Sequence, residues 1–494
     1  MTRNIYILLI IPWKTLRYSK TNKEWRINFM RRTRRTNQSS TWNPYPRASN
    51  NYHTACAGEI IGLEPPPPSA NIRVNPYFLL DGNSKRVNDK PESFSTEPKL
   101  GGEVKWAINP HTVLDLTFNT DLAQADVDRQ VNNLTRFSVF FPERRQFFLE
   151  NASLFNAGLP ESIQPFFSKK IGLDPTGNPV PIDAGVRLVS RDQNRNFNGM
   201  VVRQRENINS PAASYVIGRY CKNFSNQSRV VALITSKLQD ARDTLAATQN
   251  FTYTGDAFLR FSYALTWNVV GSASTITKKQ NGYSFVSQLQ HASNQWYLYY
   301  WQTLVDKNYD PQVGFVYYRN IVETDFGGYR IFRKLWMPKP LRQVDSGFYY
   351  HMFHRASDGK LLQVELEAFP LFFVFLSGAF ANFYIVLPWQ FLPEDISIVG
   401  FPIGTGNYQY TRYRFSYGND QSKKFSYSLR YETGNYYNGQ LDSWVASARY
   451  SPLPHIVLSV NYQHNESREL GDQKINETTD LVTPEMRLVL NPRL

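Results

Sequence analysis

The sequence predicts an all-β protein, a large antiparallel transmembrane β-barrel. The first observation is composition, because the 494 residues include 33 Phe, 30 Tyr and 10 Trp but only 2 Cys and 6 Met, and rings pack well on pleated sheets. The second is periodicity: roughly 16–19 short alternating segments, separated by polar or Gly/Asn turns, follow one another between residues 101 and 490. The mean hydropathy of -0.45 and the 19% of charged residues exclude a helical membrane protein and a disordered chain.

The positive charge of the chain is concentrated at its N-terminus. Residues 1–50 contain eleven Lys and Arg against a single acid, Glu24, so +10 of the net charge of +14 lies there. The most basic run, 26–35, alternates between apolar and polar residues, as a half-buried strand does. We therefore expect a solvated strand edge and no nucleic acid as a partner. A free, exposed cluster from Arg31 to Arg35 would favour the alternative, a polyanion-binding patch.

Four consecutive prolines, Pro65 to Pro68, divide this N-terminal piece from the rest of the chain. Such a run forms a stiff, extended spacer, and the residues that follow it are polar and turn-rich. The expected organisation is an N-terminal β piece over 1–62, a Pro-rich linker over 63–100 and a barrel domain over 101–494.

Alternation is clearest in four segments, each with apolar and aromatic residues on one face and mostly polar residues on the other: 257–268, 425–432, 443–450 and 454–464. A soluble sandwich or propeller alternates as well. The barrel is favoured because the polar face carries charges such as Arg430 and Glu432, which a water-filled lumen permits. The other face is as aromatic as the girdles of outer-membrane barrels. Closure also removes the edge strands of so long a meander.

The stretch from Ala368 to Trp389 is nearly all apolar and long enough to resemble a membrane helix. However, Pro370 and Pro388 bracket it, and Ser377-Gly378 divides it into two runs rich in Phe and Val. These features favour two strands of a hairpin over a helix.

Residues 120–172 interrupt the meander with carboxylates and guanidinium groups among Phe side chains. We expect this segment to lie in the barrel lumen or at its mouth, with its charges paired, because an unpaired buried charge is costly. The expected members of this charge network are Asp121, Asp126, Asp128, Arg136, Glu143, Arg144, Arg145 and Glu150. Two other roles stay open for the carboxylates: oxygen ligands for Ca²⁺, and an acid/base pair for glycoside hydrolysis.

Motifs that would indicate an enzyme do not occur: the sequence has no phosphate-binding loop, HExxH, nucleophile elbow or CxxC pair. Cys56 and Cys221 form no disulfide framework. His351 and His354 would point to opposite faces of a strand, so we expect no shared metal. No catalytic residue, metal or cofactor is predicted, with Ca²⁺ as the open alternative.

Several motifs together resemble a known family. The run FPERRQFFLE at 141–150 is long enough to be specific, and NLTRF at 133–137 precedes it. Further matches are FFSKKIG at 166–172, GGEVKW at 101–106, DPQVGFV at 310–316 and GNYYNG at 434–439. Together they resemble an uncharacterised family of Gram-negative outer-membrane barrels, the domain-of-unknown-function family 5916, over roughly residues 70–490.

The resemblance implies an N-terminal β-sandwich similar to family 9 carbohydrate-binding modules. Residues 11–18 and 25–29 resemble the last strands of such a module, so the chain would be a fragment at both ends, with residues 1–62 as the module's remnant. Candidate sugar-stacking residues are Trp13, Trp25 and Trp42.

The implied location is the outer membrane, and the implied partners are its lipid and an oligo- or polysaccharide. The expected role is non-catalytic binding or uptake of carbohydrate-type ligands at the cell surface. The alternative is a soluble, β-rich hydrolase of glycans, whose activity would vanish in Glu143→Gln.

Overall fold

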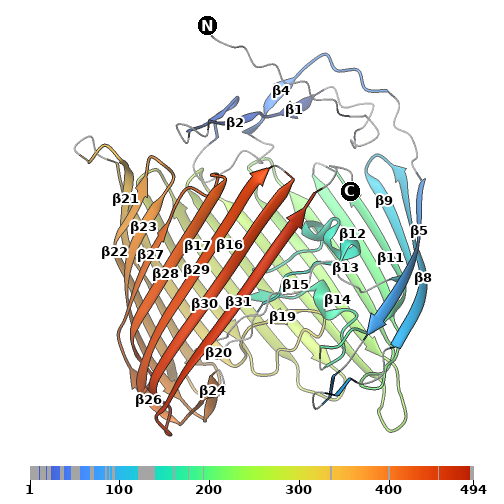
Figure 1. The fold of residues 1–494 in the computed structure, drawn as a ribbon. Coiled ribbons are helices and arrows are strands. Elements are labelled where there is room, and N and C mark those ends of the chain that lie inside the picture. Colours follow the sequence, from blue (N-terminus) through green and yellow to red (C-terminus); the bar gives the residue numbers. More distant parts are fainter. Residues whose placement is uncertain are drawn as a thin grey trace.

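The computed structural model describes residues 11, 18, 24–33, 38–45, 56–66, 72–83, 86–87, 90–91, 95–120, 140–159, 162–175, 177–192, 194–333, 337–398, 401–453 and 455–489. Nearly all of these residues lie in β-strands or in the turns between them (Figure 1), which confirms the predicted fold class. Among the residues so described, no helix is both long and apolar enough to cross a membrane.

One closed antiparallel barrel of 21 strands makes up most of the molecule. Its strands, in chain order, are β5 (Ile72–Asn83), β8 (Ser95–Asn109), β9 (Thr112–Thr120), β11 (Ile182–Arg191), β12 (Arg195–Gln204), β13 (Ala213–Asn223), β14 (Arg229–Gln239), β15 (Thr248–Arg260), β16 (Leu265–Ile276), β17 (Gly282–Ala292), β18 (Trp296–Val305), β20 (Ile321–Phe332), β21 (Leu341–Arg355), β22 (Leu361–Phe375), β23 (Phe380–Leu392), β26 (Gly406–Gln409), β27 (Arg412–Gly418), β28 (Phe425–Tyr436), β29 (Gly439–Leu453), β30 (Ile456–Leu470) and β31 (Ile475–Leu488). Successive strands are neighbours, β26 and β27 both pair with β23, and β31 and β5 complete the circle. A barrel of this size is wide enough to enclose a lumen.

The remaining elements are short. Outside the barrel's strands, β1 (Trp25–Ile27) pairs with β4 (Gly58–Ile60) and β2 (Met30–Thr33) pairs with β3 (Gln38–Thr41). The others are β6 (Arg86–Val87) with β7 (Lys90–Pro91), β10 (Ile163–Gln164) with β19 (Phe315–Val316), β24 (Ile396–Ile398) with β25 (Phe401–Ile403), the helix α1 (Gln146–Leu149), and 3₁₀ turns at Ala152–Leu154 and Ser168–Lys170.

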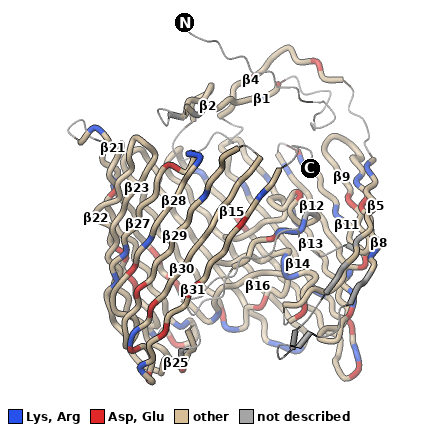
Figure 2. Tube along the Cα trace, viewed as in Figure 1, with Lys and Arg blue, Asp and Glu red and all other residues tan. Residues whose placement is uncertain are grey.

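The two faces of the barrel wall differ as the alternation predicts. On β28, Phe425, Tyr427 and Leu429 are 51%, 38% and 42% exposed and point outward, whereas Ser426 between them is buried. On β30, Leu458, Val460 and Tyr462 face outward in the same way. Apolar side chains therefore cover the outside of the barrel, which suits lipid tails. Both signs of charge are interleaved along its strands (Figure 2).

The 19 barrel strands that lie wholly within residues 101–490 agree with the expected 16–19, and β5 and β8 bring the total to 21. Three other expectations need correction. The barrel begins at Ile72, inside the range 63–100 predicted as a linker. β5 does alternate, with Ile72, Val74 and Phe78 exposed outward, but the polar residues of its other face gave the range a linker-like composition.

The segment 257–268 is not one strand but the hairpin between β15 and β16. The Ser262 hydroxyl accepts hydrogen bonds from the backbone N–H groups of Ala264 (3.2 Å) and Leu265 (3.0 Å), and it closes the turn. No Gly, Pro or Asn marks this turn in the sequence, so the alternation ran through it unbroken. The described part of the basic run, 26–33, is likewise divided between β1 and β2, because the Asn28 side chain accepts from the N–H groups of Phe29 and Asn43. Arg34 and Arg35 lie outside the described residues.

The apolar stretch 368–389 forms two hairpin strands, β22 and β23, as predicted. Gly378 lies in the connecting turn with a φ of 86°, a left-handed conformation that glycine adopts without steric cost.

The two ends of the barrel differ in their connections. Residues 110–111, 261–264 and 293–295 are short turns at one end, and the N-terminal strands β1, β2 and β4 lie at that end together with the C-terminus (Figure 1). The opposite end carries the longer connections 205–212, 306–320 and 393–405. The chain between β9 and β11 also leaves from this long-loop end.

Candidate functional site

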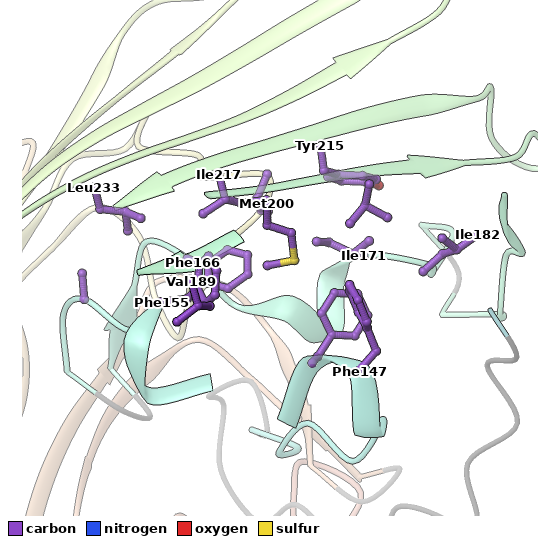
Figure 3. Close-up of a cluster of buried hydrophobic side chains, with 14 of the residues drawn as sticks. Phe147, Phe155, Phe166, Ile171, Ile182, Val189, Met200, Tyr215, Ile217 and Leu233 are labelled. Carbon is purple, nitrogen blue, oxygen red and sulfur yellow. The ribbon is translucent and has the colours of Figure 1, made fainter. Parts of the chain in front are cut away.

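A segment between β9 and β11 fills part of the barrel. Its described residues, 140–159 and 162–175, are called the insert below. Side chains of the insert pack against inward-facing side chains of the wall in one buried apolar cluster (Figure 3). Its members from the insert include Phe147, Phe155, Phe166 and Ile171, and those from the wall include Met200, Tyr215, Ile217 and Leu233.

Arg187 of β11 is the strongest polar attachment of the insert. Its guanidinium is fully buried and donates to the Asp115 carboxylate of β9, directly opposite, at 2.9 and 2.7 Å. The same group donates to the backbone carbonyls of Phe147 and Glu150, the latter at 2.7 Å. Buried charges that are paired and hydrogen-bonded hold a single geometry, so this arginine fixes the insert against the wall.

Neighbouring strands hold the insert through its backbone as well. Asn198 of β12 donates to the carbonyl of Leu154 (2.7 Å), and Arg219 of β13 donates to that of Asn156 (2.9 Å). The insert has no strand or α-helix here to pair its partly buried backbone carbonyls. These inward polar groups supply the hydrogen bonds that such carbonyls need. Further attachments of this kind are the Gly158 N–H to Asp256 and the Gly172 N–H to Gln204, both at 2.9 Å.

Part of the expected charge network lies in the insert. Glu143 accepts from the Arg145 guanidinium at 2.8 and 2.6 Å and from the Ser168 hydroxyl at 2.8 Å. Burial raises the pKa of the Glu143 carboxyl, but the hydrogen bonds and charge of Arg145 outweigh it and leave the pKa below its ordinary value. Arg145 also donates to the backbone carbonyls of Ile171 and Ser168, so the pair ties the two ends of the insert together.

The other predicted members lie apart or outside the described residues. Glu150 bonds to Lys105 of β8 and lies 3.6 Å from the Arg187 guanidinium. Arg144 is next to the Glu143–Arg145 pair, and its backbone N–H donates to the Glu143 carboxylate. Asp121, Asp126, Asp128 and Arg136 fall outside the described residues.

The candidate sugar-stacking tryptophans belong to the N-terminal piece. Trp25 packs on Tyr18, with ring centroids 5.7 Å apart. Trp42 packs on Phe29 at 5.6 Å and is 58% exposed. Trp13 lies outside the described residues.

A second aromatic surface was not predicted from the sequence. Five tyrosines and one phenylalanine face inward on β18 and β20–β23, half-buried except for the fully buried phenylalanine. Their ring centroids are 5.0–6.1 Å apart along a continuous path. This tyrosine wall consists of Tyr297, Tyr299, Tyr329, Tyr349, Phe369 and Tyr384.

The tyrosine wall adjoins paired charges on the same inner face. Arg414 of β27 donates to Glu367 of β22 at 3.0 Å and to Glu432 of β28 at 2.8 Å. Arg412 also donates to Glu432, at 2.6 Å. Glu432 and the two arginines line a cavity of about 380 Å³. The lumen therefore presents ring faces beside hydrogen-bonding charged groups.

One signal in the sequence could have indicated this surface. The start of β18 reads Trp-Tyr-Leu-Tyr-Tyr-Trp over 296–301, with rings on both faces of the strand. Leu298 and Tyr300 are exposed outward, whereas Tyr297 and Tyr299 face the lumen. Aromatic residues on the inward parity are unexpected where the inner face is polar.

Within the part of the chain that the structure describes, no group of three or more His, Cys, Asp or Glu side chains is placed to hold a metal ion. His351 lies 3.0 Å from the Asp325 carboxylate, a pair between neighbouring strands β21 and β20.

Comparison with known proteins finds similarity to a family model and to solved structures. Residues 71–196 match the family described as Domain of unknown function (DUF5916). Among solved structures, the chain is similar to the siderophore receptor PirA from Acinetobacter baumannii, with 8% sequence identity and a TM-score of 0.40 over 87% of this chain and 76% of that one. No curated protein matches the sequence.

Proposed function

We propose that this protein is an outer-membrane β-barrel that binds carbohydrate-type ligands in its lumen and guides their passage. The observation that carries the proposal is the tyrosine wall beside the Arg414 charge pairs. Sugar rings stack on aromatic faces, and their hydroxyl groups exchange hydrogen bonds with carboxylates and guanidinium groups. The apolar outer face of the barrel supports a lipid environment.

The proposed orientation follows from the connections. Outer-membrane barrels turn their short connections to the periplasm and their long loops to the outside. The long-loop end, from which the insert enters, would then face the exterior, and the N-terminal strands would lie in the periplasm. A ligand would meet the insert first and the tyrosine wall afterwards.

No hydrolytic role is proposed. The hydrolase hypothesis depended on Glu143, and a general acid in glycoside hydrolysis needs a raised pKa. The Glu143 carboxyl is instead bonded to Arg145 and Ser168, with its pKa lowered.

The test combines location with binding. Full-length protein should appear in the outer-membrane fraction and migrate differently in gels before and after boiling; folded protein in the soluble fraction would contradict the proposal. Binding of a neutral oligosaccharide, maltohexaose, is then measured by calorimetry on the detergent-solubilised protein. Tyr299→Ala should weaken it about three- to tenfold through lost stacking.

Tyr300→Ala is the matched control, because this tyrosine is the next residue of β18 and is exposed on the outer face. Its variant should bind maltohexaose as the unaltered protein does. Equal weakening by both substitutions, or no binding of the sugar by folded protein, would refute the proposed role of the tyrosine wall.

A further inference from the structure

A second cavity lies at the long-loop end, away from the tyrosine wall. Its volume is about 610 Å³. The insert contributes one side, with Phe141, Phe167 and Lys170, and the inward residue Lys237 of β14 contributes another. Residues of the connection 306–320, among them Arg319, complete it. The cavity therefore exists only because the insert is docked against the wall.

The charge of this cavity is unbalanced. Its basic side chains are Lys169, Lys170, Lys237 and Arg319, and its acids are Asp174 and Asp310. The acids are already engaged: Asp310 pairs with Arg319 at 2.5 Å, and Asp174 accepts from the side-chain amides of Asn209 (2.9 Å) and Asn207 (3.2 Å).

Two of the lysines have no such partner. Among the described residues, neither Lys170 nor Lys237 forms an ion pair or a side-chain hydrogen bond, and Lys237 is half-buried. The Asp310 carboxylate attracts the Lys237 ammonium, and the charge of Lys170 repels it. Lys170 is exposed, and the one acid that attracts the half-buried Lys237 is already paired with Arg319. An anionic group that enters the cavity would therefore add a counter-charge that these lysines share with no other group.

The cavity also offers an apolar surface. Phe141 and Phe167 are half-buried in its lining, and Phe167 packs against Phe140 and Phe315 with centroids 5.0 and 5.9 Å apart. The Lys169 ammonium lies 5.5 Å from the centre of the Phe141 ring. Rings held in this way can contact the face of a sugar while lysines receive a charged substituent.

We propose that this cavity binds the carboxylate group of an acidic oligosaccharide, and so makes anionic glycans the preferred ligand class. The inference rests on the proposed function and adds to it a site and a charge selectivity. Lys170 and Lys237 supply the counter-charge, and Phe141 and Phe167 supply the surface for the sugar ring.

The experiment compares two sugars of equal length, a galacturonic acid hexamer and neutral maltohexaose, by calorimetry on the folded full-length protein at low salt. The hexamer of galacturonic acid should bind at least roughly tenfold more tightly, and Lys170→Gln/Lys237→Gln should remove that preference while maltohexaose binding stays unchanged. Lys237→Arg, with Lys170 unaltered, should retain the preference for the acidic hexamer. Lys222→Gln, an exposed lysine at the other end of neighbouring β13, is the matched control and should have no effect.

Equal affinity for the two sugars, or an equal loss in Lys222→Gln, would overturn the inference. Inorganic phosphate that binds as tightly as the acidic hexamer would also overturn it, because the site would then recognise an anion alone. If maltohexaose binding depends on Tyr299 but the acidic hexamer is not preferred, the inference fails and the proposed function remains intact. If folded protein binds neither sugar, the proposed function itself fails.

Discussion

Two regions of the same lumen wall use inward-facing residues in different ways. On β11 to β15, the inward side chains of Arg187, Asn198 and Arg219 donate to backbone carbonyls of the insert, and apolar neighbours pack on its rings. On β18 to β23, inward tyrosines contact mainly one another, with paired charges beside them. The first region holds a piece of the same chain, whereas the second keeps half-buried rings for which the structure provides no covering segment among the described residues. A wall that holds its own insert and a wall whose tyrosine rings stay half-buried can therefore share one alternation pattern.

The substitution with the largest expected effect removes Arg187, which attaches the insert to the first region of the wall. In Arg187→Leu, the buried Asp115 carboxylate and the carbonyls of Phe147 and Glu150 lose their main donor. Breaking a buried pair on one side costs about 3–5 kcal/mol. We expect a large drop in the thermal unfolding midpoint, and cleavage within the insert by added protease.

The control is Arg203→Leu on the neighbouring strand β12, where Arg203 pairs with Asp240 at the exposed surface. A surface pair contributes about 1 kcal/mol or less, so this variant should keep its insert protected. Unfolding midpoints that fall equally in both variants would mean that Arg187 has no special role in attaching the insert.

The tyrosine wall depends on glycines that the neighbouring strands provide. Tyr329 of β20 lies opposite Gly347 of β21. A Cβ atom at Gly347 would lie 2.1 Å from the carbonyl oxygen of Gly328 and 2.6 Å from the Cβ of Tyr329. Gly347→Ala should therefore cost about 1–3 kcal/mol of unfolding free energy and displace the Tyr329 ring.

The measurement is maltohexaose affinity together with the unfolding midpoint. Gly255→Ala on β15 is the comparison variant, because a Cβ there meets nothing within 4 Å, and both quantities should stay unchanged in it. Unchanged sugar binding in Gly347→Ala would indicate that the ring positions of the wall do not matter for the ligand.

The sequence predicts the local part of this architecture and misses the part that depends on distant strands. Alternation placed Phe425, Tyr427 and Leu429 on one face, and the structure puts all three outside. The Arg187–Asp115 pair could not be predicted, because the insert separates the two strands and only their register brings the residues opposite each other. The tyrosine wall was missed for another reason. Because β18 carries aromatic residues on both faces, its inward tyrosines do not produce a periodic pattern.

Glu143 has one bonding partner that is near in the sequence and one that is distant. The guanidinium of Arg145, two residues away, donates to its carboxylate, and so does the hydroxyl of Ser168. Because the folded pKa of Glu143 lies below the ordinary value of 4.5, the contribution of the carboxylate is fully present above the unfolded pKa. That contribution disappears as the pH falls through the folded pKa. Protection of the insert from protease should therefore be constant from about pH 8 to 5 and weaken below about pH 4.

Glu143→Gln should flatten this acid dependence and lower protection at neutral pH by about 1 kcal/mol, the smallest effect predicted. Glu206→Gln provides the control, since Glu206 is an exposed carboxylate in the connection 205–212 and should leave the wild-type pH profile intact. A profile that keeps its acid drop in Glu143→Gln would mean that the Glu143 carboxylate is not the source of the dependence. The hold on the insert would then come from the barrel strands rather than from the insert's own ion pair.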